Sequence, residues 1–218
     1  MKRFVVAIDG PAGAGKSTVA QLAAKELGYT YIDTGAMYRA VAWKVLQSGR
    51  GVSDENITDC VKDIEVVLSY TDGATKVMVG QTDVTTAIRT PEVTAIVSQV
   101  ARLAPVREKM VELQRKMAEN GSVVMDGRDI ATNVLPGADV KIFLTASIEE
   151  RALRRWKEMQ AKGYTVDAEV LKQEIAARDK ADSEREISPL IQAADAQLLD
   201  TTGMTVAEVV QSILDACR

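Results

Sequence analysis

Short apolar runs alternate along this chain with longer segments in which apolar residues recur every three or four positions. Each short run has the length and composition of a buried strand. The runs span residues 4–8, 29–32, 123–125, 140–144 and 196–199. Buried strands that alternate with helical segments predict an α/β protein built on parallel strands.

The period changes to two between residues 65 and 85. Three short segments with this alternation are separated by the turn residues Asp72-Gly73 and Gly80-Gln81, a pattern typical of antiparallel hairpins. The segments are 65–70, 75–79 and 82–85. Because an antiparallel meander has no place inside a parallel sheet, we expect an insert packed on one edge of it.

Eight segments have the apolar spacing of helices. Pro91 predicts a boundary within one of them, and Ser147 with Glu150 has the spacing of a capping box. The two helices between Ser147 and Asp182 carry much charge and few large apolar residues, which is typical of a mobile lid. The predicted helices are 16–27, 35–49, 53–64, 86–102, 105–120, 147–163, 167–182 and 206–216.

The loop after the first strand has a sequence suited to phosphate binding. Residues 10–17 match G-x-x-x-x-G-K-[ST] between a predicted strand and a predicted helix. Backbone N–H groups and the helix N-terminus would hold phosphate oxygens, Lys16 would reach the β- and γ-phosphates, and Ser17 would ligate Mg²⁺. A glycine-rich turn with a chance lysine is the alternative, and the flanking strand and helix argue against it. The expected ATP-binding residues are Gly10, Pro11, Ala12, Gly13, Ala14, Gly15, Lys16, Ser17 and Thr18.

Composition limits the chemistry that the chain can perform. With no histidine among 218 residues, acid–base catalysis and metal sites based on histidine are excluded. A formal net charge of −4 argues against general nucleic-acid binding. Asp9 ends the first apolar run too early for a signal peptide, and no run approaches a membrane span. Cys60 and Cys217 are lone thiols, which fits a reducing compartment, so we expect a cytoplasmic protein. Because no apolar run is long enough for a span, we also expect no association with membranes.

Charged residues follow two further strand ends. Residues 33–39 and 126–129 come directly after predicted strands, and arginines accompany both. Transfer between two phosphates requires such positive charge. Purely structural roles remain possible at these positions. Asp33 or Thr34 could cap the following helix, and each arginine could form a surface ion pair. Asp126 would hold a water on Mg²⁺ or anchor the following turn. The arginines are Arg39, Arg107, Arg128, Arg151, Arg154, Arg155, Arg178 and Arg185.

Taken together, these motifs closely resemble those of the bacterial cytidylate kinases along essentially the whole chain. The motifs are the phosphate loop and residues 33–39, 83–89, 126–129 and 178–185; the second of these ranges contains Asp-Val-Thr at 83–85 and Ile-Arg at 88–89. The resemblance implies a single P-loop kinase domain, 1–218, with a five-stranded parallel core, and a monomer. It also implies a substrate-binding region with the β insert at about 33–104 (meander 65–85) and a lid at about 148–187. The implied reaction transfers the γ-phosphoryl of ATP to CMP or dCMP with Mg²⁺.

Carried over position by position, the resemblance assigns the phosphate-binding residues. It implies that the phosphate of the acceptor lies near Thr34, Arg39 and Arg128, with Arg185 also on the phosphates. Thr34 stands where many relatives have serine, and the hydroxyl is retained. Arg154 and Arg155 resemble the lid arginines, of which we assign Arg154 to ATP; both would otherwise be charges on a helix surface.

The resemblance also assigns the base and the sugar. It implies that Ser98, Arg107 and Asp129 contact the cytosine edge and that Arg178 and Asp182 contact the sugar. An alternative role for Asp129 is an ion pair with Arg128. The residues expected in substrate binding thus include Asp33, Thr34, Tyr38, Arg39, Ser98, Arg107, Arg128, Asp129, Arg178, Asp182 and Arg185, and those expected in catalysis are Lys16, Arg128, Asp129 and Arg178.

Other P-loop proteins are the rival interpretations. A UMP, thymidylate or shikimate kinase shares the loop and lid, but a sugar-acid substrate has no use for the insert and the residues expected to read the base. A nucleotide-binding switch of the GTPase type would carry an Asn-Lys-x-Asp motif, which is absent. A nucleic-acid motor would need a second ATPase domain and is disfavoured by the acidic charge balance.

Overall fold

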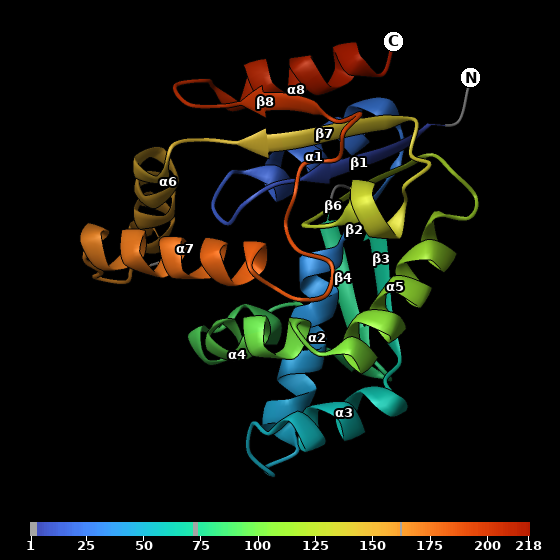
Figure 1. Cartoon of the computed structure of the whole chain (residues 1–218), viewed down its shortest axis with the longest axis vertical. Coiled ribbons are helices and arrows are strands. Elements are labelled where there is room, and N and C mark those ends of the chain that lie inside the picture. The colour runs from blue at the N-terminus through green and yellow to red at the C-terminus, as the bar shows by residue number, and fades with distance from the viewer. Residues whose placement is uncertain (1–3, 72–73, 162) are drawn as a thin grey trace.

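Five parallel strands form the central sheet of the protein, in the order β2-β6-β1-β7-β8 (Figure 1). The computed structural model describes residues 4–71, 74–161 and 163–218. All five predicted strands are confirmed. They are β1 (Val5–Asp9), β2 (Thr30–Asp33), β6 (Val123–Gly127), β7 (Val140–Thr145) and β8 (Gln197–Asp200).

The strand β6 is longer than its apolar run. Asp126 and Gly127 pair with Ile8 and Asp9 of β1, so the first two residues of the Asp-Gly-Arg-Asp motif belong to the strand rather than to the loop after it. The motif therefore begins inside the sheet, where a strand on either side fixes its backbone.

Helices cover both faces of the sheet. On one face, α1 (Lys16–Leu27) and α8 (Val206–Ala216) pack on Val6, Ile8 and Leu144. On the other face lie α5 (Ala104–Ala118) and a single π-turn, η2 (Ile130–Val134), which the sequence did not predict. The η2 turn follows the Asp-Gly-Arg-Asp motif directly and packs against the face of the sheet formed by Ala7, Ile32 and Met125.

A second core lies beyond the carboxyl end of β2, away from the sheet. It is built around α2, whose buried residues Met37, Val41 and Val45 all lie on the predicted inner face. Pro91 starts a new helix after a 3₁₀ turn, as its position predicted. The surrounding elements are α2 (Thr34–Gln47), α3 (Asp54–Lys62), η1 (Ala87–Arg89), α4 (Pro91–Ala101) and α5.

The predicted antiparallel insert is present and packs on the edge strand β2. Its strands are β3 (Val66–Thr71), β4 (Ala74–Val79) and β5 (Thr82–Asp83), and the predicted turn at 72–73 lies outside the described residues. The Tyr70 ring meets the Tyr31 ring of β2 edge to face at 5.8 Å, and its hydroxyl donates to the Gln21 carbonyl of α1 at 3.2 Å. The β5 strand ends earlier than predicted because Asp83 accepts from the N–H and the hydroxyl of Thr85, which turns the chain.

Two helices, α6 (Ile148–Ala161) and α7 (Ala168–Ser183), pack on each other and project beside the carboxyl ends of the strands (Figure 1). The expected capping box is only half right. The Ser147 hydroxyl accepts from the Glu150 N–H, but the Glu150 carboxylate binds Arg154 and the Ser147 N–H donates to Thr202.

Within the described residues, no helix has both the length and the apolar character needed to cross a bilayer. Cys60 and Cys217 are both free and buried.

Candidate active site

The phosphate loop curls between β1 and α1 with little space around it. Gly10 has φ +149°, and a Cβ there would lie 1.9 Å from the Leu144 carbonyl oxygen, so only glycine fits this turn. Gly15, with φ +90°, precedes α1, whose first turn has no acidic residue to compete with an anion. The positive end of α1 therefore faces the space that the loop encloses.

Lys16 is buried in this loop. Its Nζ donates to the Pro11 carbonyl at 2.8 Å. Burial, together with Arg128 and Arg178, holds the pKa of Lys16 well below its usual value. A lysine kept among cations in a dry site gains most when phosphate oxygens arrive beside it.

Asp126 organises the floor of the loop. Its side chain accepts from the Ser17 hydroxyl at 3.0 Å and the Tyr31 hydroxyl at 2.7 Å, and its carbonyl accepts from Thr34 at 2.7 Å. Burial and the neighbouring Asp33 raise the pKa of Asp126 to about 6. Both suggested roles, holding a water on Mg²⁺ and anchoring the turn, agree with this position, and the Tyr31 contact was not predicted.

Asp9 is the second buried carboxylate of the site and was missed by the sequence analysis, which treated it only as the end of an apolar run. Its two oxygens accept from the N–H groups of Ile130 and Ala131, each at 2.8 Å. These bonds fix the start of η2 and hence the preceding Arg128 and Asp129. A carboxylate at the end of a buried strand was the signal that could have revealed it.

The arginines expected on the acceptor side gather in one place. Each of Arg39, Arg128 and Arg178 lies close enough to its neighbours to perturb them, and burial with this mutual repulsion lowers the pKa of Arg39 and of Arg178 to about 10. Arg39 donates to Thr94 at 2.7 Å, and Arg178 Nε is buried with no partner among the described residues. Cationic side chains gathered in this way form a site for a polyanion.

Asp182 joins this cluster through Arg128, whose Nε donates to it at 2.9 Å. Although burial acts to raise it, Arg128 and Arg178 hold the pKa of Asp182 below its usual value. Arg185, three residues later, donates to the carbonyls of Ile187 and Ser188.

Two of the three residues expected to read the base, Arg107 and Asp129, also meet. Arg107 and Asp129 form an ion pair at 2.5 Å, both nearly fully buried, and Asn133 donates to the same carboxylate oxygen at 3.0 Å. The Arg107 guanidinium lies 5.6 Å over the ring of Tyr38. The alternative pairing of Asp129 with Arg128 is wrong, because Arg107 and Asn133 bind Asp129 and Asp182 binds Arg128. Ser98 is half-buried on α4.

Asp33 has structural partners on two sides. It caps α2 by accepting from the Ala36 N–H at 2.9 Å, which confirms the N-cap reading, and it pairs with Arg89 at 3.0 Å. Arg89 ends the 83–89 motif. Thr34 lies beside Gly127, where a Cβ would come 2.7 Å from the threonine hydroxyl.

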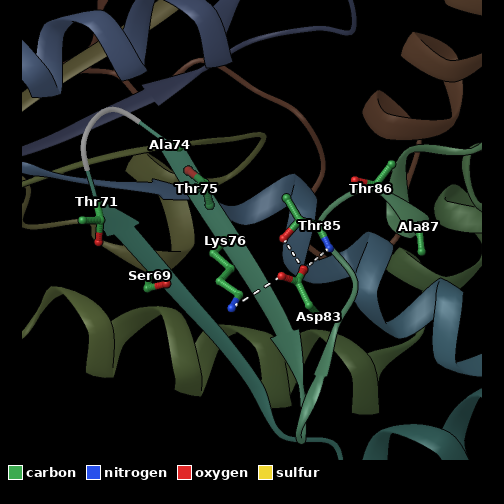
Figure 2. A pocket seen from close by; sticks show the side chains of 9 residues that line it. All are labelled: Ser69, Thr71, Ala74, Thr75, Lys76, Asp83, Thr85, Thr86 and Ala87. Atoms are coloured by element: carbon green, nitrogen blue, oxygen red, sulfur yellow. Dashed lines mark hydrogen bonds and ion pairs between the residues drawn. The ribbon is translucent and has the colours of Figure 1, made fainter.

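The start of the 83–89 motif lies in a hollow on the insert (Figure 2). The hollow has a volume of about 610 Å³, and none of the residues expected in ATP or substrate binding lines it. Lys76 and Asp83 form an ion pair across it at 3.5 Å, and Thr85 accepts from the Val77 N–H. This part of the motif holds the chain as it enters η1 and so positions Arg89 rather than touching the phosphate loop.

Helices α6 and α7 reach the phosphate loop directly. Arg151 is buried, donates to the Ala12 carbonyl at 3.0 Å and pairs with Asp179 of α7. Asp179 also accepts from the Ala12 N–H at 3.1 Å. Arg154 donates to the Ala14 carbonyl at 3.3 Å, whereas Arg155 pairs with Glu158 on its own helix at 3.2 Å. Of the two arginines expected in the lid, Arg154 therefore contacts the loop.

Cations from the phosphate loop, α2, the Asp-Gly-Arg-Asp motif and α7 thus surround one region beyond the carboxyl ends of the strands. A switch or a motor binds one nucleotide, whereas transfer between two bound phosphates needs charge on both sides of the transferred group. The fold and the site define a P-loop kinase.

Comparison with known proteins identifies the family. The family model for cytidylate kinase matches residues 6–218. The chain is 52% identical to a cytidylate kinase of Bacillus subtilis, over 99% of this chain and 96% of that protein. It is 53% identical to one of Bacillus licheniformis, over 98% and 95% of the two chains. The chain belongs to the cytidylate kinase family, as the motifs indicated.

Solved structures with low sequence identity show the shared fold. A shikimate kinase from Bacteroides thetaiotaomicron is 14% identical with a TM-score of 0.50, over 99% of both chains. An uncharacterized protein from Eubacterium ventriosum is 13% identical with a TM-score of 0.54, over 98% of this chain and 97% of that one.

Proposed function

We propose that the chain transfers the γ-phosphoryl group of ATP to CMP or dCMP, giving ADP and CDP or dCDP. The observation that carries this proposal is the buried Arg107–Asp129 pair next to the arginine cluster. An arginine edge and a carboxylate edge side by side match the acceptor and donor groups of cytosine. Membership of the cytidylate kinase family supports the same reaction, with ATP as the phosphoryl donor.

The donor phosphates bind in the loop at residues 10–18. The N–H groups of the loop and the N-terminus of α1 hold the β- and γ-phosphates, and Lys16 exchanges its bond to Pro11 for phosphate oxygens. Arg154, which already lies on the loop, contacts the bound ATP. Once these bonds form, the phosphate oxygens neutralise the buried charge of Lys16.

The residues present fit a Mg²⁺ ion. The Ser17 hydroxyl oxygen lies 3.0 Å from Oδ2 of Asp126 at the floor of the loop. The described residues contain no group of three side chains of the kinds that usually bind metals. That set suits Mg²⁺, which takes one or two protein ligands and completes its shell with phosphates and water. Ser17 would ligate it and Asp126 would hold one of its waters. When bound, Mg²⁺ neutralises charge on the β- and γ-phosphates.

The acceptor monophosphate binds opposite the donor. Arg39, Arg128 and Thr34 hold its phosphate, with Arg178 between the two nucleotides. The acceptor phosphate is itself the nucleophile, so no general base is needed. What the protein supplies is position and positive charge for two anions that repel each other in water.

The ribose and the lid complete the proposed site. Asp182 and Arg178 contact the sugar, and Arg185 reaches the phosphates when α6 and α7 close. We propose residues 148–187 as this lid, 33–104 as the substrate-binding region with its insert, and 1–218 as one domain that acts as a monomer. A cytoplasmic location and the lack of a nucleic-acid partner stay predictions.

Base recognition provides the test of this function. An ionised Asp129 accepts from the exocyclic amino group of cytosine, where uracil presents a carbonyl oxygen. The two hydrogen bonds that described residues donate to the Asp129 carboxylate both end on Oδ2, which leaves Oδ1 for the base. An unpaired polar group in such a pocket costs about 1–3 kcal/mol, so we expect CMP to be preferred over UMP roughly ten- to a hundredfold.

The experiment measures ADP release with CMP, dCMP, UMP and dTMP for the wild type and for Asp129→Asn. We expect the wild type to prefer CMP or dCMP. Because asparagine donates as well as accepts, the variant should narrow the CMP-to-UMP ratio of kcat/KM, mostly by weakening CMP use. A wild type without preference for cytidine nucleotides would refute the function, and an unchanged ratio in the variant would refute the role of Asp129.

A further inference from the structure

One residue of the phosphate loop, Ala12, is held by side chains of both α6 and α7. Its N–H donates to Oδ1 of Asp179 on α7 at 3.1 Å, and its carbonyl accepts from Arg151 on α6 at 3.0 Å. Arg151 and Asp179 also form an ion pair with each other. We call these three residues the Ala12 clasp. The clasp joins the loop to side chains that lie 139 and 167 residues further along the chain.

Arg151 is buried where it contacts the loop. It is 7% exposed, and its Nε donates to the carbonyl of Ala146, just before α6, at 2.9 Å. The loop approaches α6 so closely that a Cβ on Gly13 would lie 3.2 Å from the Cβ of Arg151. An arginine held in this way is not the surface ion pair that the sequence alone allowed. Its pairing with Asp179 offsets the cost of burying the guanidinium.

The clasp also constrains the next N–H of the loop. A trans peptide unit is planar, so its carbonyl and its N–H point in opposite directions. Because Arg151 binds the Ala12 carbonyl, the Gly13 N–H of the same peptide unit is directed away from α6. A phosphate loop binds its ligand only when its N–H groups point at one spot. The orientation of this peptide unit therefore bears on the binding of the donor phosphates.

The two charges of the clasp suit a loop that binds an anion. A lone carboxylate at the position of Asp179 would repel a triphosphate. The ion pair with Arg151 leaves the clasp without net charge, so both backbone groups of Ala12 are bound and no repulsion is added. The effect of the clasp on ATP is therefore one of geometry rather than of charge.

We propose that Arg151 and Asp179 are positioning residues for ATP: by binding both backbone groups of Ala12, they hold the phosphate loop in the shape that accepts the triphosphate. This inference deepens the proposed function and rests on it for the identity of the donor. A loop that already has its bound shape loses less conformational entropy on binding, so the clasp raises the affinity for ATP. Arg151 lies near the start of α6 and Asp179 near the end of α7, so the outer ends of both helices can move while the clasp stays formed.

The residue next to Asp179 provides an internal comparison for the test. Arg178 lies in the acceptor cluster, where burial and Arg128 lower its pKa to about 10. A substitution at 179 that merely disordered α7 would displace Arg178 and weaken the binding of the acceptor as well as that of ATP. A substitution that only releases Ala12 should weaken the binding of ATP alone.

The experiment compares Asp179→Ala, Arg151→Met and the double variant with the wild type. Calorimetry measures the Kd for ATP with Mg²⁺ in the absence of an acceptor, and the KM for CMP is measured at saturating ATP. In all three variants we expect the Kd for ATP to rise about tenfold, equivalent to about 1.4 kcal/mol, and the KM for CMP to stay within about twofold. Because the clasp acts as one unit, the double variant should bind ATP no more weakly than the single variants.

Stability separates this role from a purely structural one. Each single variant leaves a largely buried charge without its partner, which is destabilising, whereas the double variant removes both charges. Urea denaturation should therefore show that the double variant is more stable than the less stable single variant. Its Kd for ATP should remain high even so, because Ala12 is still unbound. A return of wild-type affinity for ATP in the double variant would overturn the proposal, since an unpaired charge would then explain the weaker binding.

Glu149→Gln is the matched control. Glu149 on α6 pairs with Lys172 on α7 at 2.8 Å, so this variant weakens another ion pair between the same two helices, away from Ala12. Its Kd for ATP should stay within about twofold of the wild-type value.

Two further results would contradict the role of the clasp. One is a Kd for ATP within about twofold of wild type in both single variants, and the other is an equal rise in the Kd for ATP and the KM for CMP. A wild type that binds ATP but does not phosphorylate CMP would refute the proposed function, while the calorimetry would still decide whether the clasp positions the loop.

Discussion

The donor loop and the acceptor side of this site differ in how completely their buried polar groups are paired. In the donor loop, Lys16 donates to Pro11, the Ala12 N–H donates to Asp179, and Arg151 binds the Ala12 carbonyl. On the acceptor side, Arg107 and Arg128 are ion-paired to Asp129 and Asp182, but the buried Nε atoms of Arg107 and Arg178 have no partner among the described residues. The donor loop is held in shape by the chain itself, whereas the acceptor side keeps donors unpaired.

This difference follows from what each region has to recognise. A triphosphate chain is bound mainly by backbone N–H groups, whose positions depend on the loop, so internal contacts that fix the loop favour binding. A monophosphate with a particular base is recognised by side chains, and side chains that are already satisfied would have to exchange one partner for another. Unpaired donors on the acceptor side thus favour specificity at the expense of stability.

The largest expected effect comes from removing the cation of the donor loop. Lys16→Ala should fold normally and lose phosphoryl transfer by at least about 10²–10³-fold, because no other group in the loop bridges the β- and γ-oxygens. Circular dichroism checks the fold, and ADP release checks the activity. Lys25→Ala, an exposed lysine in the last turn of the same helix, is the control and should keep full activity. A third of wild-type turnover in Lys16→Ala would mean that the donor loop is wrongly assigned.

Asp9 connects the two regions, because it ends β1 before the donor loop and binds the N–H groups of η2 on the acceptor side. Burial raises the pKa of Asp9 from 3.8 to about 6. The folded protein therefore binds this proton more tightly than the unfolded chain, so the associated stability is fully present below about pH 4 and is lost as the pH rises through about 6.

Asp9→Asn cannot titrate and should remove this part of the pH dependence. The fall in the free energy of unfolding between pH 4 and pH 7 should become smaller by up to about 3 kcal/mol, at about 1.4 kcal/mol for each pH step between the two pKa values. The pKa of Asp126 is raised in the same way, and Asp126 is still present in the variant, so a smaller fall in the free energy of unfolding remains. Urea denaturation at several pH values measures this, and an unchanged pH profile would argue against a buried, titrating Asp9.

The smallest effect is expected from Arg154, the arginine of α6 that we propose contacts ATP. Arg154→Ala loses the bonds to Ala14 and Thr201, so the KM for ATP should rise about tenfold while the KM for CMP stays within about twofold. Lys157→Ala removes an exposed positive charge from the same helix and should change neither constant. Equal increases in both constants for Arg154→Ala would mean that this arginine acts on the closed site as a whole and not on the donor loop.

Much of the fold follows from local signals in the sequence. Each strand of the sheet is a short apolar run, and the boundary at Pro91 and the break at Gly163 are properties of single residues. What sequence could not provide depends on distant partners. The strand β6 extends through Asp126 because β1 pairs with it, and Ser147 gives its N–H to Thr202 instead of to Glu150.

The candidate site divides in the same way. The phosphate loop is a continuous motif, and the resemblance supplied the arginines and Asp129. The pairing of Arg128 with Asp182 and of Asp129 with Arg107 could not be predicted, because Asp182 lies on α7 and Arg107 on α5, both far from the motif in sequence.

The order of the strands has a consequence for how the protein folds. β6 lies between β1 and β2, so Val5 and Thr30 both pair with Val123 and not with each other. During synthesis the first two strands emerge early but cannot join a sheet until the chain has been made to β6. Closing so long a loop is entropically slow, and two apolar strands stay unpaired meanwhile. We therefore expect assembly to wait for β6, with α2 and the insert folding first as a local unit, and truncation before residue 123 to leave an aggregation-prone fragment.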